Sequence, residues 1–174
     1  MTIAPSIDVH SHFYPREFLD LTENQGNRYS VRCSLEDPAG PVIEMNGHRL
    51  LPLDERYFDL EARLRSMDDQ GVDMHALSLT IPMVYWAPRD LSRQLSEVFN
   101  DACMEAHEQY PDRFVGLAML PMQEPSLAIA ELGRVENHPA IRGVYMATRI
   151  GERELSDPEF FDVYERIEDL GLPI

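Results

Sequence analysis

The sequence predicts an α/β fold with a parallel sheet, equivalent to about half of a (β/α)8 barrel. Apolar strand-like runs alternate with stretches of helical periodicity along most of the chain. Proline or glycine stands at most of the boundaries between them. A complete eight-unit barrel needs about 250 residues. The chain has 174 residues, and we therefore expect about the first four βα units and one hairpin insertion.

The first predicted strand covers residues 7–13 and is followed by an unusually long connection. Residues 22–41 are rich in asparagine, aspartate, glycine and proline, which predicts a loop. Asn46-Gly47 between apolar arms predicts a β-hairpin over residues 41–51. Residues 22–58 are thus expected to form a loop and hairpin insertion. Long excursions at the catalytic end of a barrel usually shape or cover a pocket.

Beyond the insertion, helix and strand patterns alternate regularly. The predicted order is helix 59–70, strand 72–81, helix 90–110, strand 113–120, helix 125–136, strand 141–148 and a helix from Asp157-Pro158 to Leu170. Pro173-Ile174 is predicted to begin a fifth strand. This alternation implies parallel strands with right-handed crossovers. No G-x-G-x-x-G motif follows a predicted strand, which counts against a dinucleotide-binding fold.

The composition indicates a folded and strongly acidic chain. A formal charge of −16 makes nucleic acids and anionic membranes poor partners. The sequence shows no apolar run of membrane-spanning length and no signal-peptide pattern, and Cys33 and Cys103 do not make a disulfide framework. We therefore expect a cytoplasmic protein. Every basic residue is arginine, so no lysine can form a Schiff base or, when carbamylated, bridge two metals.

His10 and His12 end the first predicted strand and are the main chemical feature of the sequence. Alternation places both imidazoles on one face, about 7 Å apart along the strand, where they can bind a single metal ion. The carboxyl end of a strand is where α/β folds place their chemistry. The motif is short, however. The alternative interpretation is an ordinary strand with one core and one exposed histidine.

Several longer motifs match one group of enzymes when they are taken together. They lie at residues 7–15, 63–72, 77–82, 85–87, 110–117, 120–123, 143–144 and 170–174. These segments resemble the amidohydrolase-related metal enzymes, in particular the branch with aminocarboxymuconate-semialdehyde decarboxylase and the aromatic acid decarboxylases. The resemblance runs along essentially the whole chain and is interrupted mainly between Thr22 and Asp54.

This resemblance implies a distorted TIM barrel that holds one divalent metal, usually zinc and sometimes manganese, with His10 and His12 as its first two ligands. It places the other ligands, and a histidine that serves in acid/base steps, beyond Ile174, so no catalytic residue is assigned. Residues 1–174 are accordingly expected to be the N-terminal half of a single barrel domain, and this chain alone to be incomplete and inactive. The end of strand 141–148 offers no bridging carboxylate, which favours a mononuclear site. The resemblance also implies a homodimer.

Three further residues are candidates for contact with a small carboxylate substrate. Trp86 follows a strand and can stack on a planar substrate, although a core tryptophan is nearly as good an interpretation. Arg149 ends a strand and can reach an anionic group. His48 lies in the hairpin that is expected to cover the pocket. By contrast, His75 is expected to be structural.

The function that these patterns predict is a metal-dependent lyase that removes CO₂ from a small carboxylated aromatic or unsaturated acid. A metal-dependent hydrolase of an amide or lactone is the alternative on the same scaffold. If 174 residues were the full length, a non-catalytic half-barrel or degenerate relative would be the second alternative.

Overall fold

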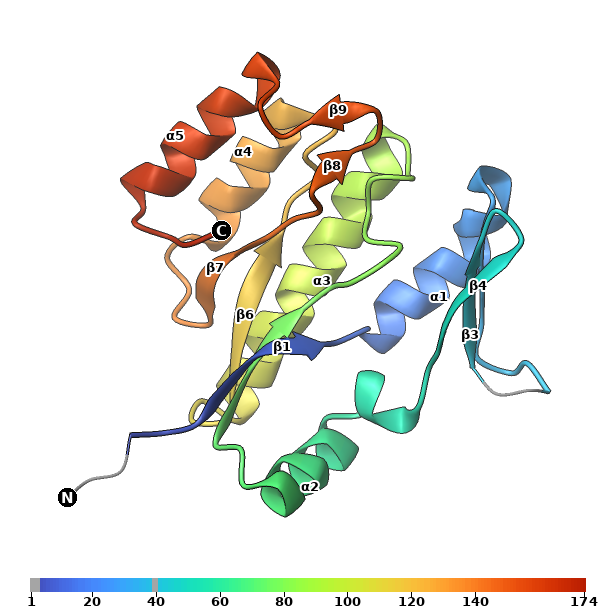
Figure 1. The fold of residues 1–174 in the computed structure, drawn as a ribbon, viewed down its shortest axis with the longest axis vertical. Helices are drawn as coiled ribbons and strands as arrows, with labels where there is room; N and C mark the ends of the chain where they lie inside the picture. Colours follow the sequence, from blue (N-terminus) through green and yellow to red (C-terminus); the bar gives the residue numbers. More distant parts are fainter. Residues whose placement is uncertain (1–3, 39–40) are drawn as a thin grey trace.

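A four-stranded parallel sheet in the order β1-β5-β6-β7 forms the centre of the fold (Figure 1). The computed structural model describes residues 4–38 and 41–174, with the backbone alone at Leu51 and Pro52. The strands are β1 (Ile7–His12), β5 (Met74–Ser78), β6 (Phe114–Met119) and β7 (Ile141–Tyr145). They are neighbours in chain order and parallel throughout, as predicted for the first four units of a barrel.

The helices after the insertion occupy the predicted segments. They are α2 (Leu60–Gln70), α3 (Arg89–Gln109), α4 (Pro125–Val135) and α5 (Phe161–Asp169), the last preceded by the 3₁₀ turn η3 (Pro158–Phe160). Local capping explains the bounds of α2. The Asp59 carboxylate accepts a hydrogen bond from the Ala62 N–H at 2.8 Å, and Gly71 ends the helix in the left-handed conformation at φ 67°.

The loop predicted over residues 22–41 is corrected by the structure. This region and its flanks form α1 (Arg16–Gln25), η1 (Gly26–Tyr29), β2 (Val31–Ser34), β3 (Val42–Met45), β4 (His48–Pro52) and η2 (Glu55–Tyr57). Phe18 and Leu19 on α1 and Val31 and Cys33 on β2 are buried, and these few apolar side chains order an otherwise polar stretch.

The insertion is therefore a small folded unit. Its strands make an antiparallel sheet in the order β2-β3-β4, and the predicted hairpin is its β3-β4 pair. Figure 1 shows this sheet beside α1, to one side of the parallel sheet.

Two further predictions need adjustment at the carboxyl ends of the strands. Strands β5 and β7 are shorter than the predicted ranges 72–81 and 141–148, because the chain leaves the sheet in turns. A short hairpin of β8 (Arg149–Ile150) and β9 (Arg153–Glu154) follows β7. No strand is assigned at Pro173-Ile174, yet the Val144 N–H donates to the Pro173 carbonyl at 2.9 Å, beside the free edge of β7.

A buried polar network joins α3, β6 and α4. The Asn100 side chain accepts a hydrogen bond from the Met119 N–H and donates to the Met119 carbonyl and to the Glu131 carboxylate. Glu131 is itself held by Arg134. Asn100 thereby satisfies backbone groups at the end of β6 that would otherwise be buried without partners.

In the part of the chain that the structure describes, no helix is long and apolar enough to cross a membrane.

We expect Asn100→Ala to lower the free energy of unfolding by about 3 kcal/mol, because the Met119 backbone and Glu131 lose buried hydrogen bonds. Urea denaturation measures this change. The exposed Glu105 on the same helix supplies the control, and Glu105→Ala should stay within about 0.5 kcal/mol of the parent protein. Equal stability of the two variants would contradict the assigned role of Asn100.

Candidate metal centre

The carboxyl end of β1 brings His10 and His12 together. Their ring centroids lie 4.9 Å apart with an interplanar angle of 70°. Both rings therefore lie on the same side of the strand, as the alternation predicts. The pairing register between β1 and β5 shifts between Asp8 and Ser11, and the Asp8 carboxylate accepts a hydrogen bond from the His10 N–H at 2.8 Å. This local irregularity precedes the two histidines directly.

His12 has the surroundings of a neutral imidazole that can bind a metal. Its Nδ1 lies 3.0 Å from the Ser78 hydroxyl oxygen at the end of β5, which leaves Nε2 available. Partial burial lowers the pKa of His12, and the nearby charges of His10 and Arg63 lower it further. The unprotonated form that a metal requires is thus favoured.

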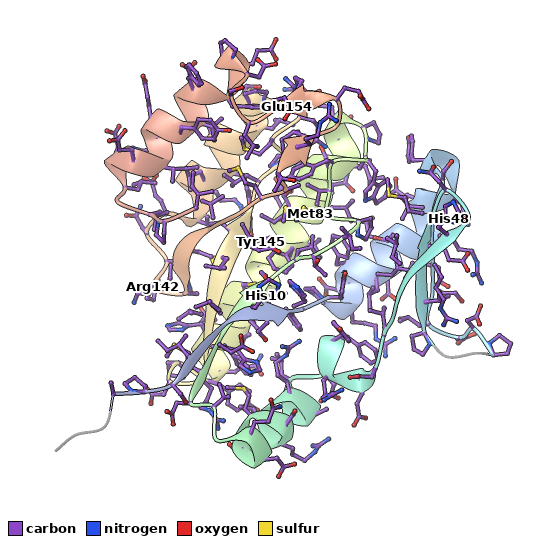
Figure 2. All side chains as sticks on the ribbon, in the orientation of Figure 1. His10, His48, Met83, Arg142, Tyr145 and Glu154 are labelled. Carbon is purple, nitrogen blue, oxygen red and sulfur yellow. The ribbon has the colours of Figure 1, made fainter. Side chains whose placement is uncertain are left out.

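Tyr145 closes the same region from the end of β7. Its ring centroid lies 6.1 Å from that of His12, and Figure 2 shows its label beside that of His10 near the middle of the molecule. Three parallel strands therefore contribute to one edge: β1 gives the histidines, β5 gives Ser78 and β7 gives Tyr145.

The donor set fits a divalent metal but does not complete a site for one. Two imidazoles on one face, one of them oriented by a hydroxyl, are suitable ligands for zinc or manganese. Across residues 4–38 and 41–174, no group of three histidine, cysteine, aspartate or glutamate side chains gathers closely enough to hold a metal ion. Among the described residues, the two imidazoles of β1 are therefore the candidate ligands at this place.

A second polar cluster supports β1 through side chains of α2 and β5. Arg63 on α2 donates to the Ser11 hydroxyl at 2.6 Å and to the carbonyl of His12. Ser11 lies 2.7 Å from Nδ1 of His75. Since the Ser11 oxygen accepts from Arg63, its proton points to His75, whose Nδ1 must then be the unprotonated nitrogen.

Burial sets the charge states in this cluster. It lowers the pKa of His75 to about 4, and the Arg63 charge adds to that effect. It also lowers the pKa of Arg63 to about 10, so the guanidinium stays charged at neutral pH. His75 is therefore neutral at neutral pH, and its hydrogen bond with Ser11 joins β5 to β1.

A cavity of about 270 Å³ adjoins both groups of residues. Residues of β1, of the η2 segment, of α2 and of β5 line it: Asp8, His10, Ser11, His12, Asp54, Arg56, Tyr57, Arg63, Ser66, Gln70 and His75. The lining is mostly polar, and Asp54 and Arg56 form an ion pair within it at 2.6 Å. The histidine pair thus lies at an accessible hollow and not in a closed core.

None of the three predicted substrate residues lines the cavity beside the histidines. Trp86 is half-buried in the loop after β5, where its indole N–H donates to the Met83 carbonyl and its ring lies 6.2 Å from that of Tyr29. The exposed His48 begins β4, and Figure 2 shows it at the edge of the molecule, apart from His10. Arg149 is half-exposed and ion-paired with Glu154 at 3.1 Å.

Sequence reasoning missed three residues that the structure places at the site. Ser78 and Tyr145 end their strands, so the rule that directed attention to His12 and Arg149 applies to them as well. Arg63 follows Leu60 by three residues and precedes Met67 by four, which puts it on the apolar face of α2. A charged residue at such a position is a signal of a buried polar contact.

Comparisons with known proteins identify the family of the chain. Residues 7–174 match the family described as Amidohydrolase. The chain belongs to this family. It is 29% identical over 172 residues to the 2-amino-3-carboxymuconate-6-semialdehyde decarboxylase of Dictyostelium discoideum, with 97% of the chain and 47% of that protein covered. It is 29% identical over 153 residues to the gamma-resorcylate decarboxylase of Rhizobium radiobacter, with 83% of the chain and 46% of that protein covered.

Solved structures show the same fold. One is the 5-carboxyvanillate decarboxylase of Novosphingobium aromaticivorans in complex with manganese and 4-hydroxy-3-methoxy-5-nitrobenzoic acid. The similarity has a TM-score of 0.76 at 22% identity and covers 97% of the chain and 49% of that structure. The chain thus spans about half the length of the curated relatives and of this structure. Its parallel sheet corresponds to part of their (β/α)8 barrel.

The neutral state of His75 predicts a pH-dependent stability. The folded protein holds the pKa of His75 at about 4, whereas an unfolded histidine titrates near 6.5. The unfolded state therefore binds more protons between these values. The contribution is full above pH 6.5 and is lost as the pH falls toward 4. We expect His75→Asn to flatten this decline by about 3 kcal/mol, as measured by urea unfolding from pH 7.5 to 4.

The matched control is His48→Asn, since His48 is exposed. This variant should keep the full decline of the parent protein. An unchanged decline in His75→Asn would show that His75 is not the neutral, buried group described here.

Proposed function

We propose that the protein is a metal-dependent decarboxylase of a small carboxylated aromatic or unsaturated acid. The observation that carries the proposal is the pair of imidazoles at the carboxyl end of β1, on an amidohydrolase scaffold. Their ring centroids lie 4.9 Å apart, and Ser78 orients the ring of His12. The named activities of the relatives support the reaction class, because they are decarboxylases of an aminocarboxymuconate semialdehyde and of gamma-resorcylate.

In this proposal His10 and His12 hold one divalent metal through neutral imidazole nitrogens. Such a metal supplies Lewis acidity toward substrate oxygens. Ser78 fixes the ring of His12 through Nδ1, which leaves Nε2 as the nitrogen that would hold the metal. Tyr145 limits the space beside His12 and offers its ring to a planar substrate.

The positions of the three predicted substrate residues suit contact with a substrate to different degrees. Trp86 keeps its role best, because it lies in the loop that leaves the carboxyl end of β5 and its indole N–H is anchored. Arg149 must release Glu154 before it can bind a carboxylate. His48 needs a movement of the hairpin toward His10 (Figure 2). We therefore rank Trp86 first among the three.

Zinc is the expected metal with manganese as the alternative, and manganese is present in the similar 5-carboxyvanillate decarboxylase structure. Two imidazole ligands accept either ion, so the proposal is a divalent metal and its test uses both. A cytoplasmic homodimer is the accompanying proposal for location and assembly, and it rests on the sequence arguments above.

The test is release of CO₂ by the protein expressed from its complete gene. Gamma-resorcylate and 5-carboxyvanillate are supplied with Mn²⁺ or Zn²⁺, and both CO₂ and the aromatic product are measured. We expect turnover that chelation abolishes and that His12→Ala lowers at least about 100-fold, because the variant lacks a metal ligand. His138→Ala is the matched control, since His138 lies before β7 at the opposite edge of the sheet.

Other outcomes separate the alternatives. Opening of an amide or lactone substrate without CO₂ release would replace the lyase with a hydrolase on the same scaffold. Metal binding with no turnover of any of these compounds would favour a non-catalytic relative.

A further inference from the structure

Arg63 contacts three consecutive residues at the end of β1. Its guanidinium donates to the Ser11 hydroxyl at 2.6 Å and to the His12 carbonyl, and it lies over the Phe13 ring with 5.6 Å between Cζ and the ring centroid. These contacts connect α2 to the strand segment that carries both histidines. In the described part of the chain, β1 pairs with β5 alone, so its other edge has no strand partner.

The peptide group between His12 and Phe13 is held at both of its ends. The Phe13 N–H donates to the Ser78 carbonyl at 2.9 Å on the β5 side. Because the N–H and C=O of a trans peptide point in opposite directions, the His12 carbonyl faces the free edge of β1. Arg63 binds it there, in the place that a neighbouring strand would take.

Arg63 also fixes the residue between the two histidines. Ser11 accepts from Arg63 and donates to His75, so both hydrogen-bonding directions of its hydroxyl are used within a buried cluster. Ser11 is thereby locked on the side of the strand opposite to the His12 ring, whose Nδ1 meets Ser78. Rotation of β1 about its own axis would break these contacts together.

A purely structural role does not account well for a charge at this position. Arg63 is 5% exposed, and its Nε has no hydrogen-bond partner in the structure. Among the described residues it forms no ion pair with a carboxylate, whereas the exposed Arg56 and the half-buried Arg113 do. Burial of an unpaired guanidinium costs several kcal/mol, and an apolar side chain of similar length would avoid that cost. What an apolar side chain would not do is hold the His12 carbonyl.

We infer that Arg63 is a positioning residue, which fixes the backbone of His12 and so the relative orientation of the two metal-binding imidazoles. This inference rests on the proposed function only in taking His10 and His12 as metal ligands. It predicts that Arg63 controls metal affinity without touching the metal. Partners that orient metal ligands in this way typically contribute about 10- to 100-fold in affinity.

The test is a Co²⁺ titration of the purified protein, followed by visible absorption, which reports both the dissociation constant and the ligand geometry. Arg63→Met keeps the length of the side chain and removes the donors. Arg63→Lys keeps the charge and can replace one of the two hydrogen bonds to β1. We expect Arg63→Met to weaken Co²⁺ binding about 10- to 100-fold with an altered absorption band, and Arg63→Lys to fall between it and the parent protein.

Arg65→Met is the matched control, because Arg65 is exposed on the same helix. It should bind Co²⁺ within about two-fold of the parent protein, and circular dichroism should show that each compared variant is folded. If Arg63→Met does not fold, Ser11→Ala takes its place. It removes one of the two Arg63 hydrogen bonds to β1, and we expect it to weaken binding in the same direction.

The outcomes separate this inference from the proposed function. Equal affinity and equal spectra in folded Arg63→Met and Arg65→Met would overturn the positioning role while leaving the metal site intact. Equal Co²⁺ affinity of the parent protein and His12→Ala would show that His12 is not a metal ligand. That result would overturn the metal site and the positioning role together.

Discussion

The alignment of β1 with β5 at their carboxyl ends is the constraint on which the candidate site depends. The Phe13 N–H bonds to the Ser78 carbonyl, and the Ser78 hydroxyl meets the His12 ring. Ser78 on β5 thus fixes both the register of β1 in the sheet and the orientation of His12, a proposed metal ligand. A displacement of β1 by one residue would turn the histidines to the opposite face. The Arg63 contacts on the free edge of β1 oppose such a displacement.

The parallel sheet and its covering helices could be predicted from the sequence because local signals agree there. Asp59 caps the start of α2 and Gly71 caps its end, and both signals are visible in the sequence. The segment with α1 and β2 could not be predicted in the same way. Its polar residues resemble those of a loop, and its order comes from burial of Phe18, Leu19, Val31 and Cys33 against the rest of the fold. Such burial is a tertiary effect that a local pattern does not carry.

The candidate site was predictable in part for a related reason. The same-face placement of His10 and His12 follows from strand geometry alone. The supports of that pair lie far away in sequence, since Arg63 and Ser78 reach β1 from α2 and β5. The sequence predicts His48 and Arg149 from their places in a hairpin and at a strand end. Neither lines the cavity beside the histidines, and Arg149 is ion-paired with Glu154. The spacing of residues along a strand predicts which of them share one face of that strand. Only the packed fold shows which side chains from distant parts of the sequence lie against that face.

Because the chain belongs to the amidohydrolase family, Arg63 and Ser78 are best understood as residues that orient a candidate metal site. The described residues provide two imidazoles, a hydroxyl that orients one of them and a buried guanidinium that holds the strand. The central claim is that the pair on β1 is the place where a metal binds. Paramagnetic broadening by Mn²⁺ tests it most directly, with the histidine ring signals followed by NMR at low molar ratios of metal. We expect the signals of His10 and His12 to broaden first while those of His48 and His138 stay sharp. Earlier broadening of His48 or His138 would contradict it.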